Sequence, residues 1–228
     1  MPRMARAALG GFAYHVLNRG VGRMRLFDKP RDFEAFEETL AETLAKTPLR
    51  LCGFCLMPNH WHFVVWPEED GQLAAFFQRL TVTHATRWTR AKRRVGYGHV
   101  YQGRFKSFPV ETDDHFYRVL RYVERNAMRA GLARRAVDWR WGSHWIRARG
   151  TAEQKAWLSS WPVPLPRRWT EYVDKAQTKG ELVALRRSVQ RSAPFGCASW
   201  VATTAEELGL QSTLRAPGRP RRTLSPNS

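Results

Sequence analysis

The order in which short apolar segments alternate with amphipathic ones is the feature that most restricts the fold of this chain. Four segments predict strands because they are short, rich in β-branched and aromatic residues, and bounded by turn residues; they are residues 12–17, 51–57, 60–66 and 104–110. Three segments predict helices because apolar residues recur every three or four positions; they are residues 30–47, 71–94 and 114–131. The predicted order is therefore strand, helix, strand, strand, helix, strand, helix.

The first six of these elements match the split βαβ arrangement of the ferredoxin-like fold. We therefore expect an α+β protein whose antiparallel sheet follows the order βαββαβ and carries its two helices on one face. The seventh element is a helix that follows the fourth strand. It is expected to begin at Thr112–Asp114, where an N-cap residue precedes acidic side chains, and to end at Gly131.

The sequence changes in character after Leu132. The remainder is rich in Trp and interrupted by Pro, and its apolar spacing predicts helices at residues 151–160, 168–176, 181–191 and 198–208. The chain is thus expected to have two parts, residues 8–132 and residues 133–228. The second part is a helical extension that ends in a basic tail.

An excess of positive charge indicates the class of partner. The chain has 38 Lys and Arg against 20 Asp and Glu among its 228 residues, and the formal net charge of +18 favours a polyanion, with nucleic acid first. Residues 71–110 contain no acidic side chain, and aromatic residues lie between their cations, as is typical of single-stranded nucleic-acid binding. The candidate contacts are Arg87, Arg90, Arg93, Arg94, Arg104 and Lys106. A solvated basic helix face is the alternative interpretation.

The C-terminal tail is a second basic region. Pro and Gly separate its arginines, so we expect an extended segment that can lie along a groove of DNA. Its candidate contacts are Arg219, Arg221 and Arg222. A disordered, solubilising end fits the same residues equally well.

Other features of the composition exclude several classes of protein. The 3 Cys are too few for a disulfide scaffold and favour a reducing cytosol. No apolar run approaches the roughly 18 residues of a membrane helix, and the N-terminus lacks the apolar core of a signal peptide. We therefore expect a cytoplasmic, chromosome-associated protein without a membrane partner. No Gly-rich phosphate loop occurs, so no nucleotide cofactor is expected.

The segment Met57–Val65 contains the sharpest chemical signal. Side chains alternate along a strand, so His60 and His62 are expected on one face, with Trp61 and Phe63 on the other. Two imidazoles close together on a rigid strand form half of a divalent metal site. Two incidental histidines are the alternative, but the position of the pair directly after a Pro-Asn turn favours metal ligation.

The helix after the fourth strand offers a further ligand and a nucleophile. Tyr122 and Asn126 are four residues apart and therefore share one helix face. Asn126 can give a carbonyl oxygen to a hard cation, and Tyr122 would then point at a phosphate held by that cation. The alternative for Tyr122 is a core position with its hydroxyl at the rim. Tyr117 competes, but it lies roughly 140° away around the helix and cannot face the same site.

Several other residues have a chemical and a structural interpretation. His15 is either a filler of the first strand or a contact for nucleic acid on the sheet face. Cys52 and Cys55 are three apart on a strand and are expected to face opposite sides as core residues. Three acidic residues near the start of the last helix are expected to cap it, with one of them available to complete a metal shell. They are Glu111, Asp113 and Asp114.

Taken together, these motifs resemble the single-tyrosine HUH transposases, and more closely the REP-associated tyrosine transposases. The resemblance extends from about residue 12 to residue 222 and depends on the combination of motifs rather than on any one of them. Up to residue 143, the matching stretches are residues 14–20, 57–62, 102–108, 121–126, 129–132 and 139–143. In the tail they are residues 194–196, Trp200, 204–205, 208–210, Thr213 and 218–220.

The resemblance implies metal-dependent cleavage and rejoining of single-stranded DNA at REP-like repeats folded as hairpins. It implies that His60 and His62 bind Mg²⁺ or Mn²⁺ and that Asn126 stands at the place of a third ligand. Tyr122 would attack the scissile phosphate, leaving a 5′-phosphotyrosine and a free 3′-OH. Residues 8–132 would be the catalytic domain, and residues 133–228 would bind the DNA repeat.

The first matching stretch adds three candidate DNA contacts, which are His15, Asn18 and Arg19. One position departs from the family, because Ala127 replaces the usual Pro and leaves the helix end less fixed. Two other functions fit part of the pattern. A binder of single-stranded nucleic acid that has lost catalysis would need no metal, and a metal-dependent phosphoesterase that uses water would form no covalent adduct. The sequence is compatible with a monomer and with a homodimer.

Overall fold

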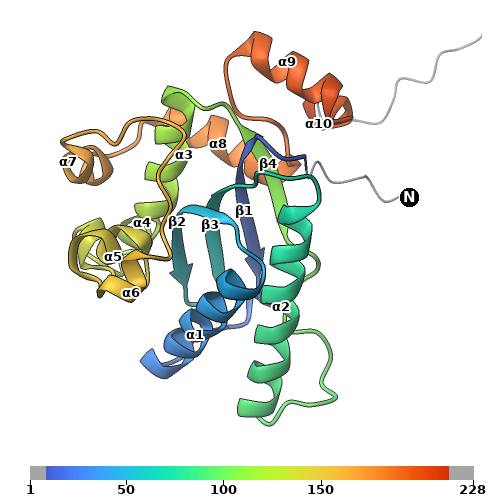
Figure 1. The fold of residues 1–228 in the computed structure, drawn as a ribbon, viewed down its shortest axis with the longest axis vertical. Coiled ribbons are helices and arrows are strands. Elements are labelled where there is room, and N and C mark those ends of the chain that lie inside the picture. The colour runs from blue at the N-terminus through green and yellow to red at the C-terminus, as the bar shows by residue number, and fades with distance from the viewer. Residues whose placement is uncertain (1–8, 216–228) are drawn as a thin grey trace, which may run out of the picture.

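A computed structural model describes residues 9–215, and a four-stranded antiparallel sheet lies at its centre (Figure 1). The strands are β1 (Ala13–Arg19), β2 (Arg50–Met57), β3 (His60–Trp66) and β4 (Lys106–Val110). Their order across the sheet is β2-β3-β1-β4, and every neighbouring pair is antiparallel. This order, with one helix between β1 and β2 and another between β3 and β4, confirms the predicted ferredoxin-like α+β fold.

Two helices cover one face of the sheet, as predicted. They are α1 (Pro30–Lys46) and α2 (Gln72–Ala91). Their apolar stripes meet the side chains of β2 and β3 that point to this face, and Phe36 and Phe77 pack against Trp61 and Phe63. Each such aromatic ring buries enough apolar surface to contribute about 2–3 kcal/mol, so this layer supplies much of the stability of the sheet.

The opposite face of the sheet is covered by α3 (Asp114–Glu124), which continues after a break into α4 (Asn126–Arg129). Asp113 caps α3 as predicted, because its carboxylate accepts the backbone N–H of His115. The prediction of one continuous helix to Gly131 is wrong at Arg125, whose φ of −82° and ψ of −2° end α3. Gly131 adopts φ of +70° and closes the following turn, where glycine is favoured.

The C-terminal extension is helical as predicted, but it has more helices than expected and several of them are short. They are α5 (Ser143–Arg149), α6 (Ala152–Lys155), α7 (Trp169–Asp174), α8 (Lys179–Arg191), α9 (Ala198–Glu207) and α10 (Gln211–Leu214). The described residues also contain two single 3-10 turns. One is η1 (Val21–Arg23), which follows β1, and the other is η2 (Ala136–Asp138), which lies at the start of the extension. The segment 151–160 keeps only the one turn of α6, while α5 and α10 were not predicted. Helices this short depend on tertiary packing.

A β-bulge changes the face on which the cysteines lie. The pairing of β2 with β3 shifts register between Leu51 and Gly53, so Cys52 occupies the extra position. Cys52 and Cys55 therefore both belong to the core beneath α3, and the expectation that they face opposite sides is wrong. Burial raises the pKa of each thiol to about 12, which fits inert core residues.

The core beneath α3 contains residues of both parts of the chain. Trp169, Leu185 and Phe195 of the extension join Phe116 and Val123 of α3 in one apolar cluster.

Among the residues that the structure describes, no helix combines the length and apolar character needed to cross a membrane.

A buried carboxylate ties α3 to the extension. Glu124 accepts hydrogen bonds from the Ser143 hydroxyl at 2.6 Å and the Trp169 indole N–H at 2.7 Å, and it pairs with the Arg147 guanidinium. Its side chain is 0% exposed. Burial raises the pKa of Glu124, but the charge of Arg147, the contact with His144 and the hydrogen bond from Ser143 outweigh this effect and hold it at about 2.

This depressed pKa predicts a pH dependence of stability. The carboxylate of Glu124 has a lower pKa in the folded chain, about 2, than its ordinary value of 4.5. Its contribution of about 3 kcal/mol is complete above pH 4.5 and is lost as the pH falls toward 2. Urea unfolding of Glu124→Gln should therefore show a lower free energy of unfolding at pH 7 than the wild-type chain. The difference should shrink as the pH falls through 4 to 3. If the free energies of unfolding of the two proteins change with pH in parallel, this carboxylate is not ionised in the folded protein.

Candidate active site

The predicted histidine pair lies on the face of the sheet that α3 covers. In the register of β3 with β1, His60 is opposite Arg19 and His62 is opposite Leu17. The two imidazole rings are 5.1 Å apart between centroids, as expected for side chains two residues apart on a strand. The Tyr122 ring of α3 lies 5.9 Å from the His62 ring and perpendicular to it. The structure thus brings the histidine pair and the predicted nucleophile together.

Hydrogen bonds behind the two imidazoles orient them. Nδ1 of His60 lies 2.6 Å from Oδ1 of Asn59, and Nδ1 of His62 lies 2.9 Å from Nε2 of His15. Outer partners of this kind fix the ring orientation of metal-binding histidines and leave Nε2 as the ligand atom. Burial, followed by the charges of Arg19 and Arg129, lowers the pKa of His60 to about 4. Burial also holds the pKa of His62 well below its usual range. Both rings are therefore neutral near pH 7, the form that binds a metal.

The amide of Asn126 has its oxygen turned away from the histidines. The Arg129 guanidinium donates to Oδ1 of Asn126 at 2.9 Å, and Nδ2 of Asn126 lies 3.4 Å from Nε2 of His60. A guanidinium has only donors, so this contact determines which side of the amide is oxygen. The histidine pair therefore fits a divalent cation as it stands. Asn126 fits as a third ligand only after its amide has rotated.

Arg129 is a residue of this site that the sequence analysis did not single out. Its guanidinium lies 4.0 Å above the Tyr122 ring and donates to the Tyr122 carbonyl oxygen at 3.2 Å. Burial lowers the pKa of Arg129, and the nearby charge of Arg186 lowers it further. The available signal was its helical spacing, because Arg129 lies three residues after Asn126 and seven after Tyr122, on the same face. It makes the surroundings of the tyrosine cationic.

His15 and Tyr117 make contacts within the protein that give each of them a structural role. His15 is 0% exposed and bonds to His62, so its predicted contact with DNA does not fit this position. Its pKa is lowered to about 3 by burial, which keeps it neutral. The Tyr117 hydroxyl donates to the carbonyl of Pro164 at 2.6 Å, and its ring packs against Trp161 and Trp169. Tyr117 therefore belongs to the packing of the extension.

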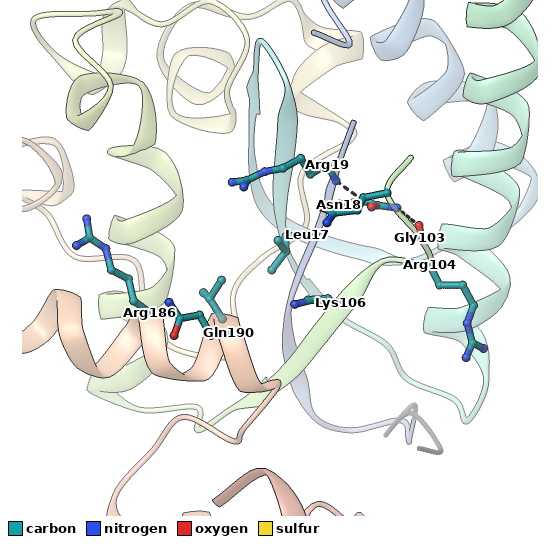
Figure 2. A pocket seen from close by; sticks show the side chains of 10 residues that line it. Leu17, Asn18, Arg19, Gly103, Arg104, Lys106, Arg186 and Gln190 are labelled. Atoms are coloured by element: carbon teal, nitrogen blue, oxygen red, sulfur yellow. Dashed lines mark hydrogen bonds between the residues drawn. The ribbon is translucent and has the colours of Figure 1, made fainter. Parts of the chain in front are cut away.

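A basic cleft of about 510 Å³ opens beside the histidine pair, between the end of β1, residues 102–106 and α8. Arg19, Lys106 and Arg186 extend into the same space, whereas Arg104 extends to the other side of β4 (Figure 2). Asn18 also lines the cleft, but its amide bonds to Gly103 and to the backbone N–H of Arg19. Among the candidate DNA contacts, Arg19 and Lys106 are thus the cations that lie beside the site.

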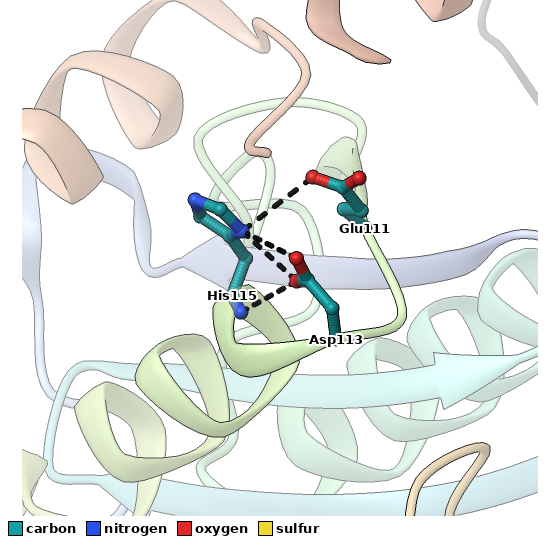
Figure 3. Close-up of side chains that lie close together, drawn as sticks. All are labelled: Glu111, Asp113 and His115. Carbon is teal, nitrogen blue, oxygen red and sulfur yellow. Dashed lines mark hydrogen bonds and ion pairs between the residues drawn. The ribbon is translucent and has the colours of Figure 1, made fainter. Parts of the chain in front are cut away.

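A second cluster of metal-ligating side chains lies at the far end of β4 (Figure 3). Ligand atoms of Glu111, Asp113 and His115 lie within 4.8 Å of one another and could hold a cation. Val110 pairs with Ala13, six residues from the end of β1 that pairs with His60. At about 3.3 Å per residue, the two places are about 20 Å apart. The idea that an acid of this segment completes the shell of the histidine pair is therefore wrong.

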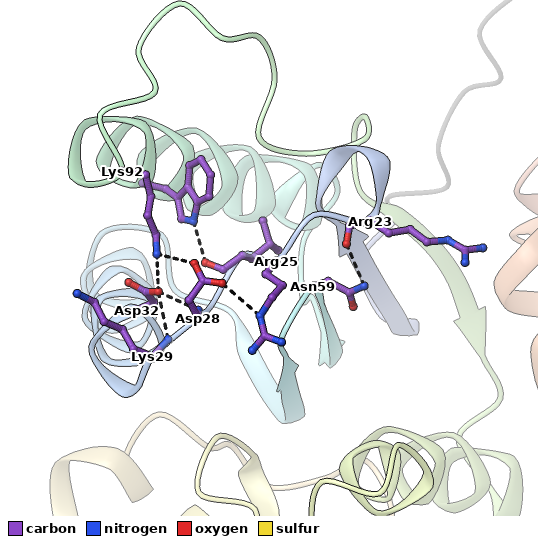
Figure 4. A network of polar contacts seen from close by, with 9 residues as sticks. Arg23, Arg25, Asp28, Lys29, Asp32, Asn59 and Lys92 are labelled. Carbon is purple, nitrogen blue, oxygen red and sulfur yellow. Dashed lines mark hydrogen bonds and ion pairs between the residues drawn. The ribbon is translucent and has the colours of Figure 1, made fainter.

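The cations of α2 lie on the opposite side of the sheet from the histidine pair. Arg87 forms a two-pronged ion pair with Glu42 of α1. Lys92 pairs with Asp28 and Asp32 at the start of α1 (Figure 4). Arg90, Arg93 and Arg94 are exposed near the end of α2. These positions separate the predicted DNA contacts of α2 from the cleft.

The aromatic residues of the acid-free segment are mostly core residues. Trp88, Tyr101 and Phe105 are each buried, and Tyr97 is the exposed ring, at 76%. Their alternation with cations therefore reflects a helix and a loop that pack inward, and it does not form a row of rings for stacking on bases. The tail candidates Arg219, Arg221 and Arg222 lie outside the described residues.

With this geometry established, comparison with known proteins identifies the family. The sequence model described as "Transposase IS200 like" matches residues 9–126. This range covers more than half of the chain and includes both histidines, Tyr122 and Asn126. The chain therefore belongs to the IS200-like transposase family. No curated protein matches the sequence.

One solved structure supports the fold. A REP-associated tyrosine transposase bound to a REP hairpin aligns with a TM-score of 0.55 at 16% identity, over 78% of this chain and 93% of that chain. A protein of Deinococcus radiodurans R1, whose name assigns it provisionally to the transposases, aligns with a TM-score of 0.38 at 13% identity, over 57% of this chain and 95% of that chain. The first likeness shows a shared fold, and the second score is too low to carry an argument.

The position of Asn126 predicts the effect of a substitution on metal binding. In Asn126→Asp, one carboxylate oxygen can stay with Arg129 while the other faces His60, so no rotation is needed. We expect the affinity for Mn²⁺ to rise by about tenfold, because a negatively charged oxygen ligand binds a hard cation more tightly than an amide does. Isothermal titration calorimetry measures this directly, with Asn126→Ala as the matched control. Equal affinities in all three proteins would exclude residue 126 from the metal site.

Proposed function

We propose that this chain is a single-tyrosine transposase that cleaves and rejoins single-stranded DNA at REP-like hairpins with Mg²⁺ or Mn²⁺. The observation that carries the proposal is the position of the Tyr122 ring, 5.9 Å from His62 and beside a pair of neutral imidazoles. Membership of the IS200-like family supports the reaction class. The hairpin substrate is supported by the REP hairpin bound to a protein of the same fold.

The proposed reaction transfers a DNA strand to the tyrosine and back. The Tyr122 oxygen attacks the scissile phosphorus while the bond from phosphorus to the 3′ oxygen breaks. The phenol gives up its proton and the departing 3′ oxygen gains one, so the products are a 5′-phosphotyrosine and a free 3′-OH. A second 3′-OH can then reverse the step, because the covalent intermediate conserves the energy of the phosphodiester bond.

The residues around Tyr122 have separate tasks in this proposal. His60 and His62 hold the cation, which supplies polarisation of a phosphoryl oxygen when bound. Arg129 holds the tyrosine backbone and lies over one face of its ring. Arg19 and Lys106 bind DNA phosphates in the adjacent cleft. The exposed α2 cations and the basic tail would add contacts to the hairpin outside the cleft.

Two competing functions make different predictions. A metal-dependent phosphoesterase would use water and would not need Tyr122. A binder without catalysis would not need the neutral histidine pair, and the two outer hydrogen bonds that orient these rings favour a working site over a vestigial one.

A denaturing gel tests the proposal. The protein is mixed with single-stranded hairpin repeats from beside its own gene in the presence of Mn²⁺. We expect a protein band that is shifted by covalently attached DNA. Tyr122→Phe should bind the same DNA and form no adduct, a loss of at least about a hundredfold because the nucleophile is absent.

Tyr117→Phe is the matched control, since it removes a tyrosine hydroxyl from the same helix away from the histidines. It should retain the adduct. Adduct formation by Tyr122→Phe would move the nucleophile elsewhere. Cleavage without any adduct, and with Tyr122→Phe fully active, would favour the phosphoesterase.

A further inference from the structure

Helix α8 of the extension has three faces with three different surroundings. Leu182, Leu185 and Val189 pack into the core beneath α3. Arg187 and Arg191 turn toward α10 and donate to the carbonyl oxygens of Leu214 and Thr213. These two faces thus hold α8 in place against the core and against α10.

The third face of α8 is directed at the basic cleft. Arg186 and Gln190 are four residues apart, so they share this face, and both line the cleft that also contains Arg19 and Lys106 (Figure 2). Both side chains are exposed. Within residues 9–215, Arg186 has neither a hydrogen bond nor an ion pair.

The cleft holds positive charge that the described protein does not neutralise. The cations that extend into it are Arg19, Lys106 and Arg186, and its lining includes no carboxylate. Nε of Arg19 is a buried atom without a hydrogen-bond partner among the described residues. A buried donor without a partner costs free energy, and clustered cations repel one another. An anion bound between β1 and α8 would remove both costs.

We propose that Arg186, together with Gln190, binds a backbone phosphate of the single-stranded DNA beside the scissile phosphate, so that α8 completes the substrate cleft. This inference rests on the proposed function. The family match ends at residue 126, so it does not extend to α8. A guanidinium can contact two oxygens of one phosphate, and the Gln190 amide can donate to a phosphate oxygen or to a base edge.

The chain provides a closely matched pair of variants. Arg186→Ala and Arg187→Ala remove the same side chain and the same charge from adjacent positions of one helix. Only Arg186 lines the cleft, while Arg187 faces α10. Any effect of net charge or of helix propensity is therefore shared by both variants, and a contact in the cleft affects one of them.

Fluorescence anisotropy with a hairpin repeat that carries a single-stranded foot measures the effect over a series of salt concentrations. We expect Arg186→Ala to weaken binding about tenfold. The slope of log affinity against log salt concentration should become shallower by about 0.7, the amount for one phosphate contact on a single strand. Arg187→Ala should remain within about twofold of the wild-type affinity. Gln190→Ala should weaken binding less than Arg186→Ala and leave the salt dependence unchanged, because it removes no charge.

Equal losses of affinity in Arg186→Ala and Arg187→Ala would overturn the inference. So would a loss of affinity in Arg186→Ala that is the same for a blunt hairpin without the single-stranded foot. Adduct formation by the wild-type protein keeps this result separate from the proposed function. If the adduct forms but Arg186→Ala binds like Arg187→Ala, the role of α8 is wrong and the transposase reaction stands. If neither adduct nor binding occurs, the proposed function fails, and the inference fails with it.

Discussion

The buried carboxylate of Glu124 is the interaction on which the rest of the structure depends. It lies two residues after Tyr122 and two before Asn126, so its side chain points to the opposite side of the helix from both. Removing this charge from water would cost several kcal/mol if it were unpaired. Donors from Ser143 and Trp169, which belong to two different helices of the extension, offset this cost. The contacts behind α3 therefore determine where its front presents the tyrosine.

Much of the high positive charge of the chain serves the fold. Arg87 and Lys92 hold α2 to α1, and Arg140 binds both carboxylate oxygens of the largely buried Glu37. Arg19 and Arg129 have no carboxylate partner among the described residues, and they lie near the neutral histidines, where they help to lower the pKa of His60. The same electrostatic environment that keeps the imidazoles neutral also attracts a polyanion to them.

The sequence predicted those features that follow from local periodicity. Alternation along a strand placed His60 and His62 on one face, and the order of elements predicted the sheet. Features that depend on contacts between distant segments could not be predicted. A bulge in the pairing of β2 with β3 reversed the direction of Cys52. The short helices α5 and α10 and the inward packing of the aromatic residues after α2 also depend on tertiary contacts, which no local pattern encodes.

The attachment of α3 to the extension limits how this protein can be divided or recombined. A fragment that ends where the family match ends would contain His60, His62, Tyr122 and Asn126 but not Arg129. It would lack Ser143, Arg147 and Trp169, and Glu124 would keep a buried charge without its donors. A fragment or chimera of this chain should therefore keep the extension together with the sheet.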